Sequence, residues 1–338
     1  GNSSTDRDIV NNIDLSGEGG MVWTKEITGS QDHTLFDTER GTNRINPNND
    51  SAQFGDPDGV RAYNSNGYNL SNGGDVNATG DKYVSWTFRK APKFFDVVTY
   101  TGTGVAGRTV GHNLGSAPGM MFVKKTNASD EWYVFHRSEG GGKTGYLNHT
   151  NAFGTASAVW NNTAPTSTVF TVGTINGTNQ DGQSYVAYLF AHNNNDGEFG
   201  PNSDQDIIKC GTATTPSSAA DFEVNLGFEP QFLIYKLRSA GGWYIHDAMR
   251  SLHHDNSTQP TLFANQNYHE NQITTNNHVE PIATGFRLTQ NAVNQALGTN
   301  APFIYMAIRR GPLAEPTSAT DVFGIDSNTG QTGMQTGI

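Results

Sequence analysis

The segment Trp243 to Arg250 holds the clearest group of side chains that could contact a ligand. It has the composition of a β-strand, whose alternation places Trp243 and Asp247 on one face and His246 on the other. Proteins bind sugars where planar polar side chains lie beside the face of an aromatic ring. The candidate saccharide-binding residues of this segment are Trp243, His246, Asp247 and Arg250. The competing interpretation is structural, an Asp–Arg pair that closes the end of a strand.

The same Asp–Arg spacing occurs once more, at Asp37 and Arg40. The corresponding segment between them in the chain departs from it, because His136 and Arg137 stand there without an aspartate. Two further aromatic residues, Trp160 and Tyr268, are candidate stacking platforms for a glycan.

Metal ligation and catalysis are weakly indicated. Asp32, His33 and Asp37 could gather, as could His253, His254 and Asp255, but neither group has a recognised ligand spacing. We therefore expect no metal site and no cofactor, although the oxygen-rich runs 193–196 and 56–58 leave calcium open.

Nothing in the sequence points to a catalytic group. The Gly-x-Ser-x-Gly pattern of serine hydrolases is absent, and Cys210 lies in an expected strand, where a buried thiol is inert. Carboxylate pairs for glycoside cleavage are set in space, so sequence spacing does not identify them. We expect a protein that is not an enzyme.

The elements that position these residues recur along the chain. A strand of aromatic and β-branched residues occurs at 83–89, 185–191 and 303–309, with offsets of 102 and 118 residues. Before each copy come a leucine beside glycine or proline, an apolar strand that ends in lysine, an aromatic strand with a polar end, and an aromatic-x-apolar step. Repetition at about one domain length predicts a repeated domain.

Three modules follow from this repeat. The first module covers 1–92 and lacks its opening strand, the second covers 93–202 and the third covers 203–310. An extended tail or linker follows at 311–338. Modules 2 and 3 open with strands at 95–102 and 206–211, whereas Gly1 begins in the following loop. We therefore expect the chain to be a fragment of a longer one. The tail could cross to a neighbouring subunit or lead into a further domain.

Composition favours an all-β fold. Charged residues are 16% of the 338 residues and glycine accounts for 39, which suits short strands and polar turns more than helices. We expect three tandem antiparallel β-sandwich modules of jelly-roll or lectin-like type, with β-propeller blades as the alternative. The continuously apolar run at 232–235 suits a strand buried on both faces.

Charge, cysteine content and hydropathy argue against nucleic-acid binding, an internal disulfide and membrane insertion. The net charge of −11 argues against nucleic acid, whose phosphates require clustered basic residues. The single cysteine rules out an internal disulfide. No apolar run approaches the roughly 20 residues that span a bilayer, so no membrane partner is expected.

A resemblance to a known family rests on three segments, 83–92, 108–119 and 223–230. They resemble a repeated module in virion proteins of marine bacteriophages, such as those that infect cyanobacteria. The resemblance extends to about residue 310 and implies a structural protein of the virion exterior: a tail fibre, a knob or a capsid decoration. It implies virion proteins as partners and a homo-oligomer, trimeric if fibre-like, and it carries over no catalytic residue. The alternatives are a module that binds a host receptor or surface polysaccharide, and an enzyme that degrades an envelope polysaccharide.

Overall fold

The computed structural model describes residues 1–252, 258–270, 274–276 and 278–311. The predicted all-β fold is confirmed, since the described strands form antiparallel sheets and the helices are short turns between strands. The proposed ligands His253, His254 and Asp255, and the tail beyond Gly311, lie outside the described residues.

The first large sheet has five strands, in the order β5 (Phe54–Gly55), β4 (Gly41–Ile45), β3 (Thr34–Asp37), β2 (Gly20–Glu26) and β8 (Tyr83–Arg89). A smaller sheet accompanies it, in the order β1 (Arg7–Val10), β7 (Gly67–Leu70) and β6 (Val60–Asn64). We call these two sheets lobe 1.

The second large sheet has six strands, in the order β14 (Gly154–Thr155), β13 (Lys143–Tyr146), β12 (Trp132–His136), β11 (Met120–Lys125), β16 (Ser184–Phe190) and β9 (Phe95–Thr101). Its smaller companion pairs β10 (Arg108–Gly111) with β15 (Val169–Val172). These sheets form lobe 2.

The third large sheet again has five strands, in the order β17 (Ile208–Thr214), β26 (Pro302–Arg309), β19 (Pro230–Leu237), β20 (Tyr244–Asp247) and β22 (Leu262–Phe263). The smaller sheet orders β18 (Phe222–Asn225), β25 (Gly285–Leu288) and β24 (Val279–Ile282). A separate pair joins β21 (Thr258–Pro260) and β23 (Thr274–Asn276). These sheets form lobe 3.

Among the described residues, helical structure is confined to four short segments. They are α1 (Gly74–Asn77), α2 (Asn176–Asn179), α3 (Gln290–Ala292) and the π-helix η1 (Val293–Leu297). Each lies between the last strand of a smaller sheet and the repeated strand of its lobe.

One pairing pattern recurs in the three large sheets. The lysine-ended strands β2, β11 and β19 each pair with the next strand of the chain on one side, and with β8, β16 or β26 on the other. The last three are the repeated strands expected at 83–89, 185–191 and 303–309. The module boundaries at 92, 202 and 310 remain predictions.

The large sheets are buried on both faces. In β2, Val22 packs into the interior of lobe 1 with Phe36 and Tyr68, whereas its neighbours Met21 and Trp23 join a core shared by all three lobes. A continuously apolar strand such as 232–235 fits this situation, because each of its faces meets another apolar layer.

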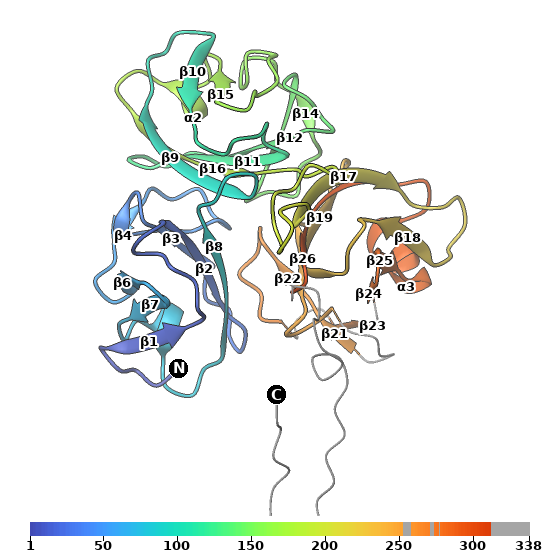
Figure 1. Ribbon diagram of the computed structural model, residues 1–338, viewed down its shortest axis with the longest axis horizontal. Coiled ribbons are helices and arrows are strands. Elements are labelled where there is room, and N and C mark those ends of the chain that lie inside the picture. The colour runs from blue at the N-terminus through green and yellow to red at the C-terminus, as the bar shows by residue number, and fades with distance from the viewer. Residues whose placement is uncertain (253–257, 271–273, 277, 312–338) are drawn as a thin grey trace, which may run out of the picture.

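The lobes therefore surround a common centre instead of lying in series (Figure 1). Phe88 of β8 lies 5.5 Å from Phe190 of β16 and 5.9 Å from Phe232 of β19, measured between ring centroids, so side chains from all three lobes meet there. The smaller sheets lie on the outer side of each lobe (Figure 1). Burial of apolar surface between lobes is the force that closes this arrangement.

Candidate functional site

The joints between lobes use backbone hydrogen bonds at corresponding positions. In each joint, a backbone amide near the edge strand β5, β14 or β22 of one lobe donates a hydrogen bond to the neighbouring lobe. The acceptor is the carbonyl of the residue that follows the lysine-ended strand of that lobe. The pairs are Gln53 to Thr126 (2.8 Å), Phe153 to Arg238 (2.9 Å) and Glu270 to Ile27 (3.3 Å). Because the pairs run from lobe 1 to 2, 2 to 3 and 3 to 1, the three lobes close into a ring.

Aromatic side chains reinforce two of these joints. The indole N–H of Trp132 donates to the Asn46 carbonyl at 3.0 Å, and that of Trp243 donates to the Tyr146 carbonyl at 2.8 Å. In lobe 1 the corresponding residue is His33, which accepts a 2.9 Å hydrogen bond from the Trp23 indole of its own lobe. Trp243 is therefore a joint residue.

In each large sheet, the strand that follows the lysine-ended strand ends against the repeated strand of a neighbouring lobe; these strands are β3, β12 and β20. Asp37 accepts from the Tyr188 hydroxyl at 2.6 Å, and Asp247 accepts from the Trp86 indole at 3.2 Å. In lobe 2 the corresponding residue is His136, whose Nε2 lies 3.2 Å from the Tyr305 carbonyl oxygen. One structural position thus makes a polar contact in all three joints.

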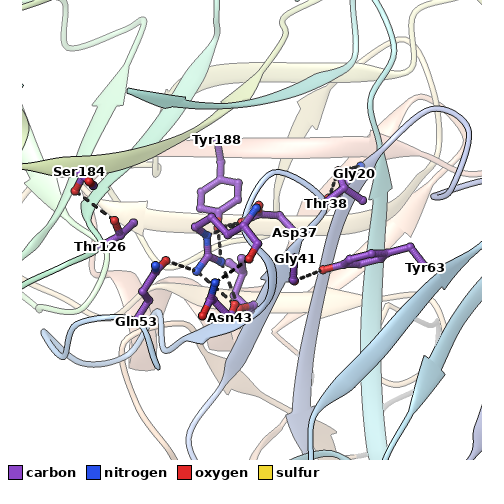
Figure 2. Close-up of polar contacts among 12 residues, drawn as sticks. Gly20, Asp37, Thr38, Gly41, Asn43, Gln53, Tyr63, Thr126, Ser184 and Tyr188 are labelled. Carbon is purple, nitrogen blue, oxygen red and sulfur yellow. Dashed lines mark hydrogen bonds and ion pairs between the residues drawn. The ribbon is translucent and has the colours of Figure 1, made fainter. Parts of the chain in front are cut away.

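The densest polar cluster, the Asp37 cluster, joins lobes 1 and 2 (Figure 2). Arg40 Nε lies 2.6 Å from Asp37 Oδ2, and the two side chains are 3% and 0% exposed. Arg40 also donates to the Tyr188 oxygen at 3.0 Å and to Gln53 Oε1 at 3.2 Å. Every strong polar group here has a partner, as burial of charge requires.

The surroundings keep the Tyr188 hydroxyl protonated and the Arg40 guanidinium charged. Burial raises the pKa of the Tyr188 hydroxyl well above its ordinary value, despite the opposing effect of Arg40. Burial would lower the pKa of Arg40, but Tyr188 and Asp37 together raise it. A protonated tyrosine and a charged arginine are complementary, and neither is poised to exchange a proton near neutral pH.

The Asp247 cluster joins lobes 3 and 1 in a related way. Arg250 and Asp247 form a 2.6 Å ion pair whose side chains are each 7% exposed, and the guanidinium lies 5.7 Å from the Trp86 ring centroid. His246 is fully buried and stacks on Tyr235 at 5.8 Å. The alternative that treats this Asp–Arg pair as a strand closure therefore agrees with the geometry.

Three buried lysines occupy corresponding positions near the ends of β2, β11 and β19. Burial lowers the pKa of Lys25, Lys124 and Lys236 to about 8. Lys124 donates to the Asp50 carbonyl at 3.1 Å and Lys236 to the Thr150 carbonyl at 3.2 Å, both across a joint. The ammonium groups of Lys124 and Lys236 thus exchange water for backbone carbonyls of the preceding lobe, whereas Lys25 donates to the Gly29 carbonyl of its own lobe.

An open polar groove of about 410 Å³ lies beside the Asp37 cluster. Its polar lining comes from both lobes and includes Glu39, Arg40, Asn43, Gln53, Thr126 and Ser184. A second cavity, of about 500 Å³, lies beside β8 and reaches Phe88, Asp247 and Ile308. The polar groove offers hydrogen-bonding groups to a ligand, whereas the cavity has an apolar wall.

The aromatic residues proposed as stacking platforms lie mostly inside the protein. Trp243 and Trp160 are 0% and 1% exposed, so protein atoms cover both of their ring faces. Trp160 packs edge-on against Phe135 at 6.1 Å. Tyr268 is half-buried and is not brought together with either tryptophan. The two indoles therefore do not carry a glycan site in this structure.

The residues weighed as metal ligands are otherwise engaged. Asp32 accepts from the side-chain amides of Asn46, Asn48 and Asn49, and His33 accepts from Trp23. Within the described ranges, no three His, Cys, Asp or Glu residues gather as a metal ion would require. Neither of the oxygen-rich runs considered for calcium, 56–58 and 193–196, contributes to such a group among the described residues.

Sequence reasoning missed the residues that receive these contacts. Tyr188 and Trp86 occupy the same place in the repeated strand, and Met306 stands there in the third copy. The repeat itself could have identified this position. The rest of the strand is similar in the three copies, but this position holds a phenol, an indole or a thioether, which indicates that it contacts a different residue in each copy.

The geometry defines a class of protein: an antiparallel β protein whose charged and aromatic groups are buried at joints between three sheet pairs. The chain belongs to a family described as a domain of unknown function, DUF7483, whose model matches residues 1–312. No curated protein and no solved structure matches it. None of the described helices is long and apolar enough to cross a membrane.

Proposed function

We propose that this protein is a structural component of a bacteriophage virion exterior, a tail fibre, knob or capsid decoration, and that it acts without catalysis. The observation that carries the proposal is the use of its charged groups. Asp37–Arg40 and Asp247–Arg250 are buried ion pairs within their own lobes, and each pair also contacts Tyr188 or Trp86 of a neighbouring lobe. These charged residues connect parts of the protein and are not presented to a substrate as reactive groups.

The resemblance of segments 83–92, 108–119 and 223–230 to marine phage virion modules supports the same proposal. A closed ring also suits an extracellular particle, because it joins the first and last sheets and needs no disulfide. The partners we propose are other virion proteins and further copies of this chain.

Purified particles test this proposal. Immunogold labelling with an antibody against this chain should decorate intact virions, and mass spectrometry should find its peptides at a constant ratio to the capsid protein. Release of sugar from envelope polysaccharides by the isolated chain, or absence from washed particles, would overturn the proposal.

A second candidate function is recognition of a host surface glycan or receptor. The groove beside the Asp37 cluster favours it, since amide, carboxylate and guanidinium groups from two lobes line one opening. Saccharides are held by such planar polar groups. A glycan array tests this candidate: binding that Asn43→Ala weakens and Asn161→Ala leaves unchanged would support it, and absence of binding would contradict it.

A further inference from the structure

The strand β8 has an open edge. It pairs with β2 on one side and ends the order of its sheet, whereas β16 and β26 are each paired on both sides. Their second partners are β9 and β17, the opening strands of lobes 2 and 3. Among the described residues, no strand occupies the corresponding place in lobe 1.

The side chains of β8 reflect this difference. Ser85 and Thr87 are partly exposed, whereas Ala187 and Leu189, at the corresponding positions of β16, are fully buried. A sheet edge with unpaired backbone groups is a template for another strand.

The residues around the cavity beside β8 correspond to those that surround a buried phenylalanine in lobe 2. In lobe 2, Phe95 of β9 lies 5.2 Å from Phe190 of its own lobe and 5.5 Å from Phe88 of the preceding lobe. The corresponding pair around the 500 Å³ cavity is Phe88 and Ile308, and both line it. An apolar residue in the place of Phe95 would therefore enter this cavity.

The chain itself leads to this place. Arg310 and Gly311, which follow β26 and end the described residues, also line the cavity. Residues 312–338 follow them. The eleven-residue step from Gly311 to Val322 reaches at most roughly 36–40 Å when extended, which is ample for a site that begins at Gly311.

The continuing sequence contains a third copy of the opening-strand pattern. Both known copies read apolar, apolar, any residue, apolar: Phe94 to Val97 and Ile207 to Cys210. Val322-Phe323-Gly324-Ile325 has the same order. Aligned on these copies, Phe323 corresponds to Phe95 and Ile208.

We propose that residues 321–326 of this chain bind along β8 as an antiparallel strand and complete the large sheet of lobe 1. The register follows from the other lobes, where Phe95 is opposite Phe190 and Ile208 is opposite Ile308. It places Phe323 opposite Phe88, Ile325 opposite Trp86 and Asp326 opposite Ser85. The inserted Phe323 ring fills the cavity between Phe88 and Ile308.

Thiol cross-linking in the full chain tests the register. With a short bis-maleimide, Ser85→Cys/Asp326→Cys should cross-link within one chain at least roughly fivefold faster than Ser85→Cys/Thr332→Cys, because pairing raises the effective concentration of only the first pair. The native Cys210 is buried and does not compete. Equal rates, or cross-links only between two chains, would overturn the proposal.

Hydrogen exchange supplies a second test that does not depend on engineered cysteines. Phe323→Asp/Ile325→Asp should lower the protection of the 83–89 amides at least about tenfold, since the outward-facing amides lose their partners. Met334→Asp, which lies beyond the proposed strand, should leave that protection unchanged. Unchanged protection in the double variant, with the rest of the fold intact, would also overturn the proposal.

Discussion

The hydroxyl of Tyr188 lies 2.6 Å from Oδ2 of Asp37, although 151 residues separate them in the chain. Tyr188 is in the repeated strand of lobe 2, and Asp37 ends the second strand of the large sheet of lobe 1. The contact therefore belongs to the joint between lobes 1 and 2, where it adds to the buried ion pair of Asp37 and Arg40.

Removing that hydroxyl should weaken the joint. Tyr188→Phe leaves Asp37 and Arg40 with one partner fewer in a buried site, which costs about 1–3 kcal/mol of unfolding free energy. Urea unfolding followed by tryptophan fluorescence measures the loss. A matched control is Tyr235→Phe, because the Tyr235 hydroxyl is buried with no hydrogen-bond partner among the described residues. That control should be neutral or stabilising, and an equal loss in both variants would contradict the assignment.

The tryptophan joints make a related prediction. Trp132→Phe removes the indole N–H that reaches the Asn46 carbonyl and leaves a space beside it. The combined loss of a hydrogen bond and of packing should cost about 2–4 kcal/mol. Thermal unfolding should show a lower midpoint for this variant, and a midpoint equal to that of the wild type would show that the bond contributes nothing.

Acid should destabilise the protein through His136. Burial lowers its pKa to about 3, so the native state keeps the ring neutral while the unfolded chain, with an ordinary pKa near 6.5, takes up a proton. Stability is therefore fully present above about pH 6.5 and falls as the pH drops toward 3, by up to about 1.4 kcal/mol per pH unit. His136→Gln should flatten this slope between about pH 6 and 4 in urea titrations. An unchanged slope would contradict the burial of a neutral imidazole.

The buried lysines predict the same kind of dependence in mild alkali, where the unfolding free energy again rises with pH. A lysine with a native pKa of about 8 binds fewer protons in the folded state between about pH 8 and its ordinary 10.5. Unfolding free energy should therefore rise with pH from about 8 to 9.5, before tyrosine ionisation in the unfolded chain reverses the trend. Lys124→Met should reduce the rise by up to about 1.4 kcal/mol per pH unit. A variant with the wild-type slope would show that Lys124 does not titrate in this window.

Much of the fold could be predicted from sequence because strand signals are local. The repeated run at 185–191 became β16 and its two copies became β8 and β26, since β-branched and aromatic residues without a breaker favour extended pairing. The continuous apolar character of 232–235 also indicated burial on both faces. What covers the second face could not be read, because it belongs to another lobe.

The candidate site shows the same limit. Alternation correctly separates His246 from Trp243 and Asp247, but it does not say whether a face meets solvent or protein. Trp243 was a reasonable sugar platform by type, and its burial follows from docking against the Tyr146 carbonyl of lobe 2. Docking between lobes depends on contacts about 100 residues apart, such as Trp243 with Tyr146, which no local pattern encodes.

The contact between Trp86 and Asp247 tests ring closure most directly, because it joins the first lobe to the third across 161 residues. A double-mutant cycle with Trp86→Phe and Asp247→Asn, measured by urea unfolding, isolates its coupling energy. The closed ring predicts that the two substitutions are non-additive by about 0.5–3 kcal/mol. Additive effects would show that lobes 1 and 3 do not meet in solution and would contradict the ring.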